Sequence, residues 1–135
     1  MIKWKDSYSV GYKDFDEQHM ELIRLINKVE ALIKDKDLDE DTLFDEVNQI
    51  FAEILDYTVY HFESEEKVFD EKNYENNETH RKAHQEFVEN VKDLVGTFDS
   101  GKEVREIAFK IYNTLVEWLI KHILGTDKLY MKKLD

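Results

Sequence analysis

The chain has 135 residues, the size of one domain with one core, and its 41% hydrophobic content is sufficient to form that core. A net charge of −12 argues against nucleic acids and anionic membranes as partners, and the lack of cysteine excludes disulfides and thiolate metal sites. With no proline and only four glycines, the composition favours long helices over a loop-rich β fold. There is no N-terminal apolar signal segment and no long apolar run, so we expect a soluble, cytoplasmic protein.

The first helix is predicted to follow an N-terminal arm that carries Trp4 and Gly11. Asp14 is its predicted N-cap, with Glu17 three residues on as the capping-box partner. We expect this helix to run from about Phe15 to Asp35. Its apolar stripe is spaced by three and four residues and consists of Leu22, Ile26, Val29 and Ile33.

The second helix is predicted from about Leu43 to Phe69 or slightly beyond. A turn containing Asn76 and Asn77 follows, and the third helix is expected to start near Glu78. The stripe of the second helix is Leu43, Val47, Ile50 and Ile54, and that of the third is Phe87, Val91, Leu94 and Phe98.

The fourth helix follows a break at residues 99–101 and is expected to end at Gly125. Its stripe is Val104, Ala108, Ile111, Leu115 and Trp118. Four amphipathic helices with short connections predict an all-α fold, an up-down-up-down antiparallel four-helix bundle with a short C-terminal tail. A single domain is expected over residues 1–135. Coiled-coil pairing is the competing interpretation, but these stripes are wider than a two-position seam.

All five histidines fall on the inward faces of these helices. One inward histidine is usually a hydrogen-bonded core residue, but five unpaired buried imidazoles would each cost about 1–3 kcal/mol. In an antiparallel bundle all of them also lie at the same end. A shared metal site explains both observations, and its predicted imidazole ligands are His19, His61, His80, His84 and His122.

Two carboxylates are candidate ligands beside these histidines. Glu65 follows His61 by four residues, about 40° around a helix, and therefore points inward. Glu63 lies about 200° away, on the outer side, and Glu66 about 140° away, at a flank. Asp127 lies five residues after His122, so geometry brings it to the site only if the helix distorts near Gly125, and spacing alone leaves its role open.

If these seven groups hold two metal ions together with a bridging oxygen, one coordination position stays open for a small molecule. Imidazole-rich sites accept Zn, Cu, Ni and Fe, so the spacing alone does not name the metal. A di-zinc hydrolase is the main rival to a small-molecule binder. It would require a general acid or base beside the metal-bound water, for which Glu66 is the remaining candidate.

The combination of "DEQHMELIRLIN", "HFESEE", "HRKAH" and "WLIKHILGTDKLY" resembles the hemerythrins, specifically the single-domain bacteriohemerythrins, over nearly the whole chain. Four-helix bundles include this family, so the resemblance and the fold prediction are not independent. The resemblance implies two non-haem iron ions with an oxo or hydroxo bridge. It assigns one iron to His80, His84 and His122 and the iron with the open position to His19 and His61, with Glu65 and Asp127 as bridging ligands.

The function implied by the resemblance is reversible dioxygen binding without enzymatic turnover, as in an oxygen carrier, storage or delivery protein. Four residues resemble the apolar lining of the family's oxygen pocket, although each would equally suit plain core packing: Phe62, Trp118, Leu119 and Ile123. The alternatives are an oxygen or redox sensor, a di-iron enzyme acting on peroxide or nitric oxide, and a metal buffer. Phe69 and Glu75 depart from the usual family pattern, where methionine and proline are common. No exposed apolar stripe indicates an oligomer, so a monomer fits the pattern.

Overall fold

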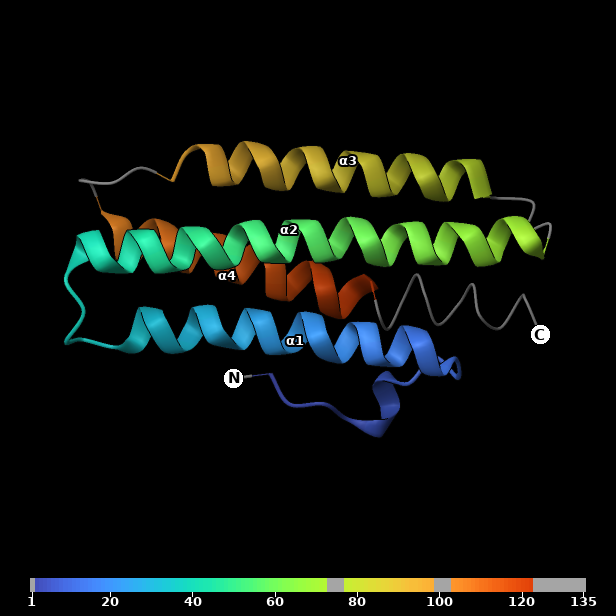
Figure 1. Cartoon of the computed structure of the whole chain (residues 1–135), viewed down its shortest axis with the longest axis horizontal. Helices are drawn as coiled ribbons and strands as arrows, with labels where there is room; N and C mark the ends of the chain where they lie inside the picture. Colours follow the sequence, from blue (N-terminus) through green and yellow to red (C-terminus); the bar gives the residue numbers. More distant parts are fainter. Residues whose placement is uncertain (1, 73–76, 99–102, 123–135) are drawn as a thin grey trace.

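The computed structural model describes residues 2–72, 77–98 and 103–122, and all regular structure in these ranges is helical. A short 3-10 turn, η1 (Asp6–Tyr8), precedes the four long helices. The long helices are α1 (Lys13–Lys34), α2 (Glu40–Glu71), α3 (Asn77–Gly96) and α4 (Val104–Lys121). Consecutive helices run in opposite directions along a common axis (Figure 1). The predicted up-down-up-down bundle is therefore confirmed.

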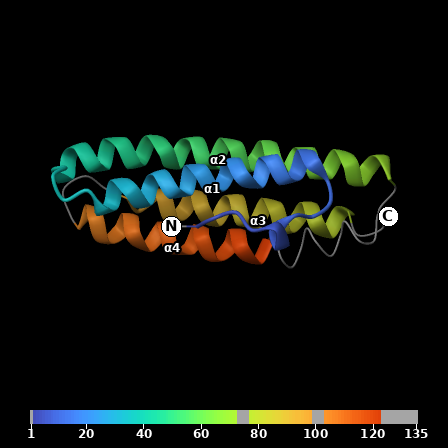
Figure 2. The ribbon, with the colours of Figure 1, turned by 90° about the horizontal axis from the view of Figure 1, so that it is seen from below.

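Helix α2 is central to the bundle, since it packs against each of the other three long helices. Helix α1 packs against α2 and α4, whereas α3 packs mainly against α2. The view from below shows α1 and α2 side by side, with α4 at the opposite edge (Figure 2). The start of α1, the end of α2, the start of α3 and the end of α4 thus occupy the same end of the molecule.

The apolar stripes predicted for α1 and α4 lie in the core. All four stripe residues of α1 are buried, and so are the stripe residues of α4 other than the partly buried Trp118. On α2 the inward face changes along the helix, from apolar side chains to mostly polar ones. It continues after Ile54 with Thr58, His61, Glu65 and Phe69, all of them buried. One end of the bundle is therefore an apolar core, and the other end encloses polar side chains.

The predicted start of the first helix is wrong. Helix α1 begins at Lys13, its N-cap is Tyr12, and neither Asp14 nor Glu17 forms a capping box. The carboxylate that joins the arm to the helix is Asp16, which accepts hydrogen bonds from the Val10 amide (2.9 Å) and the Ser9 hydroxyl (2.5 Å). These contacts to the arm favour a helix start before Asp14.

The N-terminal arm runs back along α1 (Figure 1), and it is held there by both polar and aromatic contacts. The Asn27 side chain accepts from the Ile2 amide at 3.0 Å and donates to the Ile2 carbonyl at 2.8 Å. Trp4 and Tyr8 pack edge to face, with ring centroids 5.8 Å apart. Gly11, with a φ of 80°, adopts the left-handed conformation between the arm and α1 that glycine accommodates most easily.

The other helix boundaries are close to the predicted ones. Helix α2 begins at Glu40, three residues before Leu43, because the Asp39 side chain caps it by accepting from the Thr42 amide at 2.7 Å. Phe98 lies just beyond the end of α3, yet it is buried and stacks on Phe44 with centroids 4.8 Å apart. The predicted end of the fourth helix, at Gly125, lies outside the described residues, as does the C-terminal tail.

Candidate metal centre

Five buried imidazoles converge at the polar end of the bundle. None of the five histidines is more than 6% exposed, so the prediction that all of them face inward is confirmed. The Nε2 atoms of His19 and His61 are 3.0 Å apart, and those of His61 and His122 are 3.2 Å apart. The rings of His80 and His84, one turn apart on α3, have centroids 4.1 Å apart. Helices distant in sequence thus bring potential metal ligands into contact.

The ligand atoms fall into two compact groups, each able to surround an ion. One group is His19, His61 and His122, and the other is Glu65, His80 and His84; within each group the ligand atoms lie within 4.8 Å of one another. The resemblance implied a different division, with His122 on the side of His80 and His84. In the structure the His122 Nε2 atom is close to His61 and also to Glu65 of the second group. The division of the histidines between two ions therefore stays a prediction.

Glu65 connects the two groups because its carboxylate lies close to histidines of both. Its Oε1 atom is 2.8 Å from His61 Nε2 and 3.1 Å from His122 Nε2. Its Oε2 atom is 4.0 Å from His80 Nε2 and, among the described residues, has no hydrogen-bond partner. A carboxylate with no exposed surface normally pairs both oxygens, since an unpaired buried polar group costs free energy. A cation bound on this side would satisfy Oε2.

Gln18 fixes the orientation of His61. Its Oε1 atom can only accept, so His61 Nδ1 carries the hydrogen of this 2.6 Å bond. A neutral His61 then directs the lone pair of Nε2 towards Glu65 Oε1, itself an acceptor, at 2.8 Å. Two acceptors at this distance require a proton or a metal ion to attract both of them. The possible ligands are thus several imidazoles, one of them oriented by Gln18, and a carboxylate that they share. This set of ligands suits a pair of transition-metal ions.

The role of Gln18 in orienting His61 was not predicted, although the position of Gln18 in the sequence indicates that it faces inward. It lies three residues after Phe15 and four before Leu22, both buried on the inward face of α1, and is itself only 6% exposed. A polar residue at helical spacing within an apolar stripe, next to a histidine, is the pattern expected of a residue that orients a ligand.

Glu66 is closer to the site than its place on the helical wheel indicated. Helical spacing placed Glu66 only at a flank of α2, but the residue is partly buried and its Oε2 lies 3.5 Å from His84 Nδ1. Arg81 forms an ion pair with Glu66 at 3.2 Å and a second one with Asp70. Burial raises the pKa of Glu66, while the Arg81 guanidinium acts in the opposite direction. Glu63 is exposed, as predicted.

A cavity of about 200 Å³ lies against the histidines, between α3 and α4. Phe62 and Trp118 line it together with His80, His84 and His122. The Phe62 ring stacks on His84 with centroids 3.7 Å apart, and Trp118 stacks on His122 at 4.7 Å. These contacts place two of the four predicted pocket residues beside potential ligands.

The other predicted site residues lie elsewhere. Leu119 is fully buried in the core and does not line this cavity. Ile123 and Asp127 lie outside the described residues, so their predicted roles stay predictions. Within the ranges that the structure describes, no helix is long and apolar enough to cross a bilayer.

Comparison with known proteins identifies relatives along nearly the whole chain. The family model described as "Hemerythrin HHE cation binding domain" matches residues 10–134. The chain is 30% identical over 129 residues to a hemerythrin-like protein of Naegleria gruberi, covering 96% of this chain and 90% of that one. It is 27% identical to a bacteriohemerythrin of Clostridium acetobutylicum, with 97% and 99% of the two chains covered. A bacteriohemerythrin of Stenotrophomonas maltophilia is 25% identical over 96% of this chain and 79% of its own length.

Proposed function

The chain belongs to the hemerythrin family, and from this membership and the geometry of its buried histidines we propose that it binds dioxygen reversibly at two non-haem iron ions. The observation that carries the proposal is the position of Glu65, whose buried carboxylate lies close to histidines of both groups. Such a carboxylate can neutralise and bridge two cations at once. The proposed role is that of an oxygen carrier, store or delivery protein, without enzymatic turnover.

The proposed ligands are the five histidines with Glu65 and Asp127 as bridging carboxylates. His19 and His61 would hold the iron with an open position, and His80, His84 and His122 would hold the other. The iron pair would supply reversible electron exchange with dioxygen. Neutral imidazoles outnumber carboxylates in this set, which stabilises the oxidised irons less than a carboxylate-rich site would and favours return to the reduced state.

The protein's own part in this function is to orient the ligands and to limit water. Gln18 is hydrogen-bonded to the Nδ1 atom of His61, and Glu66 lies close to the Nδ1 atom of His84. In both histidines the Nε2 atom is left to face the other ligands. Such outer partners set the tautomer and the basicity of metal-bound histidines. The aromatic rings of Phe62 and Trp118 cover the cavity side of His84 and His122. A wall of this kind reduces the access of water, which promotes irreversible oxidation.

The proposal is tested by loading the purified chain with ferrous iron without oxygen, measuring iron per chain, and recording the visible spectrum as air is admitted and removed. About two irons per chain and a visible band that develops in air and is lost on deoxygenation are expected. A protein that retains zinc and stays colourless would contradict the proposal. Irreversible oxidation would instead favour a redox sensor or an enzyme.

A further inference from the structure

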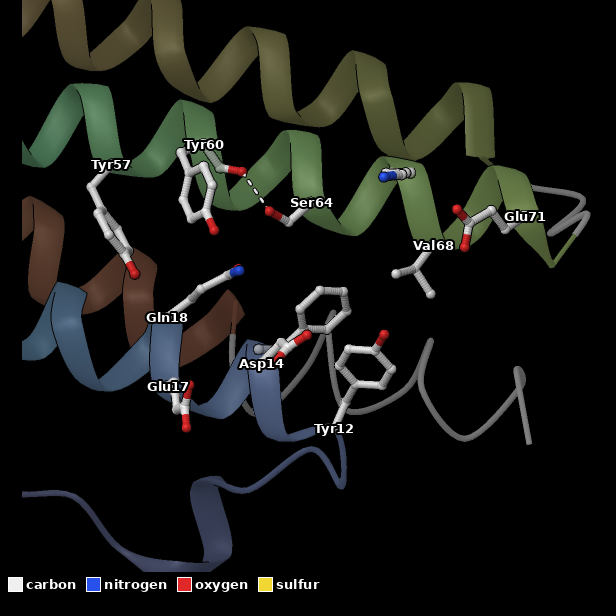
Figure 3. A pocket seen from close by; sticks show the side chains of 11 residues that line it. Tyr12, Asp14, Glu17, Gln18, Tyr57, Tyr60, Ser64, Val68 and Glu71 are labelled. Carbon is white, nitrogen blue, oxygen red and sulfur yellow. Dashed lines mark hydrogen bonds between the residues drawn. The ribbon is translucent and has the colours of Figure 1, made fainter.

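A second and larger cavity, of about 450 Å³, lies between the first turns of α1 and the second half of α2. Its volume falls within the range of small-molecule sites, about 300–1,000 Å³. Aromatic side chains form much of its wall: Tyr12 and Phe15, whose centroids are 4.6 Å apart, and Tyr57 and Tyr60, 5.5 Å apart. Figure 3 shows Tyr57 and Tyr60 reaching from α2 towards α1, with Tyr12 on the opposite side. These rings suit a ligand with an aromatic body.

Gln18 is shared between this cavity and the histidine cluster. Its Oε1 atom accepts a hydrogen bond from His61. Among the described residues, His61 is the only hydrogen-bond partner of the Gln18 side chain. The amide end is directed into the space between α1 and α2 (Figure 3), although the residue is 94% buried. Its Nε2 hydrogens are therefore donors that a ligand's oxygen atom can satisfy. An unused amide donor at the inner wall favours an oxygen-bearing occupant.

The charged groups of the cavity narrow the class of ligand. Three carboxylates, Asp14, Glu17 and Glu71, line it together with a single cation, Lys67. This excess of negative charge disfavours an anionic ligand. An amine would suit the carboxylates, but its ammonium group has only donors and leaves the Gln18 amide without an acceptor. A neutral hydroxyl both accepts from the amide and donates to a carboxylate.

We propose that this cavity binds a small neutral aromatic diol of the dihydroxybenzene class. One hydroxyl oxygen accepts from Gln18 Nε2, the ring packs against Tyr12 and Phe15, and the second hydroxyl donates to one of the carboxylates that line the cavity. The Gln18 side chain then connects the ligand to His61, because its Nε2 binds the ligand and its Oε1 binds His61. Binding requires neither iron nor dioxygen, so the site is independent of the proposed oxygen function.

The test is anaerobic calorimetric titration of the full chain with 1,4-dihydroxybenzene, in its iron-loaded form and again without added metal. Saturable one-site binding is expected in both forms, with benzoate and benzylamine each weaker by about tenfold or more, the effect of one missing hydrogen bond or one charge conflict. Benzoate tests the charge argument, and benzylamine tests the need for an acceptor.

Two variants locate the site, and a third serves as the control. Gln18→Glu replaces the amide donor by an acceptor, and Tyr12→Leu removes a ring at the opposite wall; each is expected to weaken binding about tenfold or more. Phe109→Leu changes an exposed ring that does not line the cavity and is expected to have no effect. Circular dichroism verifies that each variant is folded. Lack of saturation, undiminished affinity in both cavity variants, or tighter binding of benzoate or benzylamine would overturn the proposal.

Discussion

Substitution of Glu65 by glutamine tests the central feature of the proposed metal centre. The variant keeps the shape of the side chain but removes the negative charge that faces both groups of imidazoles. If the carboxylate bridges two ions, both of them lose an anionic ligand. Loss of residues that merely orient ligands lowers metal affinity about 10–100-fold, so we expect a loss of about 100-fold or more here.

The size of the effect follows from the linkage between binding and folding. At a free metal concentration about 100 times the dissociation constant, binding at one site stabilises the native state by about 2.7 kcal/mol. For 135 residues the unfolding entropy is about 0.28 kcal/mol per degree, so this corresponds to a rise of about 10 °C in Tm. A variant that binds about 100-fold more weakly would gain only about 0.4 kcal/mol, or about 1–2 °C.

The assay is thermal unfolding followed by circular dichroism, under anaerobic conditions, with and without ferrous iron. Each variant serves as its own reference, so any change in the stability of the chain without metal is removed. Glu63→Gln is the matched control, because Glu63 is exposed two residues away on the same helix. A full rise in Tm for Glu65→Gln, or an equal loss for Glu63→Gln, would refute the assignment of Glu65.

Three further predictions concern contacts around the site and in the core. Replacing Gln18 by leucine should lower metal affinity about 10–100-fold, measured by competition with a chelator, because His61 loses the partner of its Nδ1 atom. Replacing Tyr112 by phenylalanine should lower the free energy of unfolding in urea by about 2 kcal/mol, since its hydroxyl donates to the buried Glu30 carboxylate; the exposed Tyr60→Phe serves as the control and should change little. The Tyr112 hydroxyl also lowers the pKa of Glu30, so its contribution is complete above the ordinary glutamate pKa and is lost as pH falls through the lowered value. The difference in stability between wild type and Tyr112→Phe should therefore shrink as the pH falls below about 4, and a difference that grew with acidity would contradict the assignment.

The inward positions of the ligands could be predicted because they follow from helical periodicity alone. His61 and Glu65 extend the stripe that begins with Leu43 on α2, and His122 lies seven residues after Leu115 on α4. The alternation of helix direction then brings these ends together without any knowledge of side-chain contacts. The fold and the membership of the histidine cluster depend only on these two regularities.

Features that depend on contacts between elements were harder to predict. Asp14 is a residue type favoured at N-caps and has Glu17 three residues on, but the helix begins earlier, where Asp16 binds the arm. Glu66 lies at the flank of its own helix, and only the approach of α3, with Arg81 and His84, makes it part of the surroundings of the site. A helical wheel records angles within one helix and contains no information on a neighbour's position.

The central position of α2 explains how one carboxylate can serve two groups of ligands. Glu65 lies on the helix that packs against each of the other long helices, so its oxygens can reach histidines of both α3 and α4. Helix α3 packs mainly against α2 and does not share this central position. His61, one turn earlier on the same face, adds the contact to His19 of α1. The two inward positions of a single helix turn thus connect all four helices, and this pair is where a change of side chain should disturb both metal positions together.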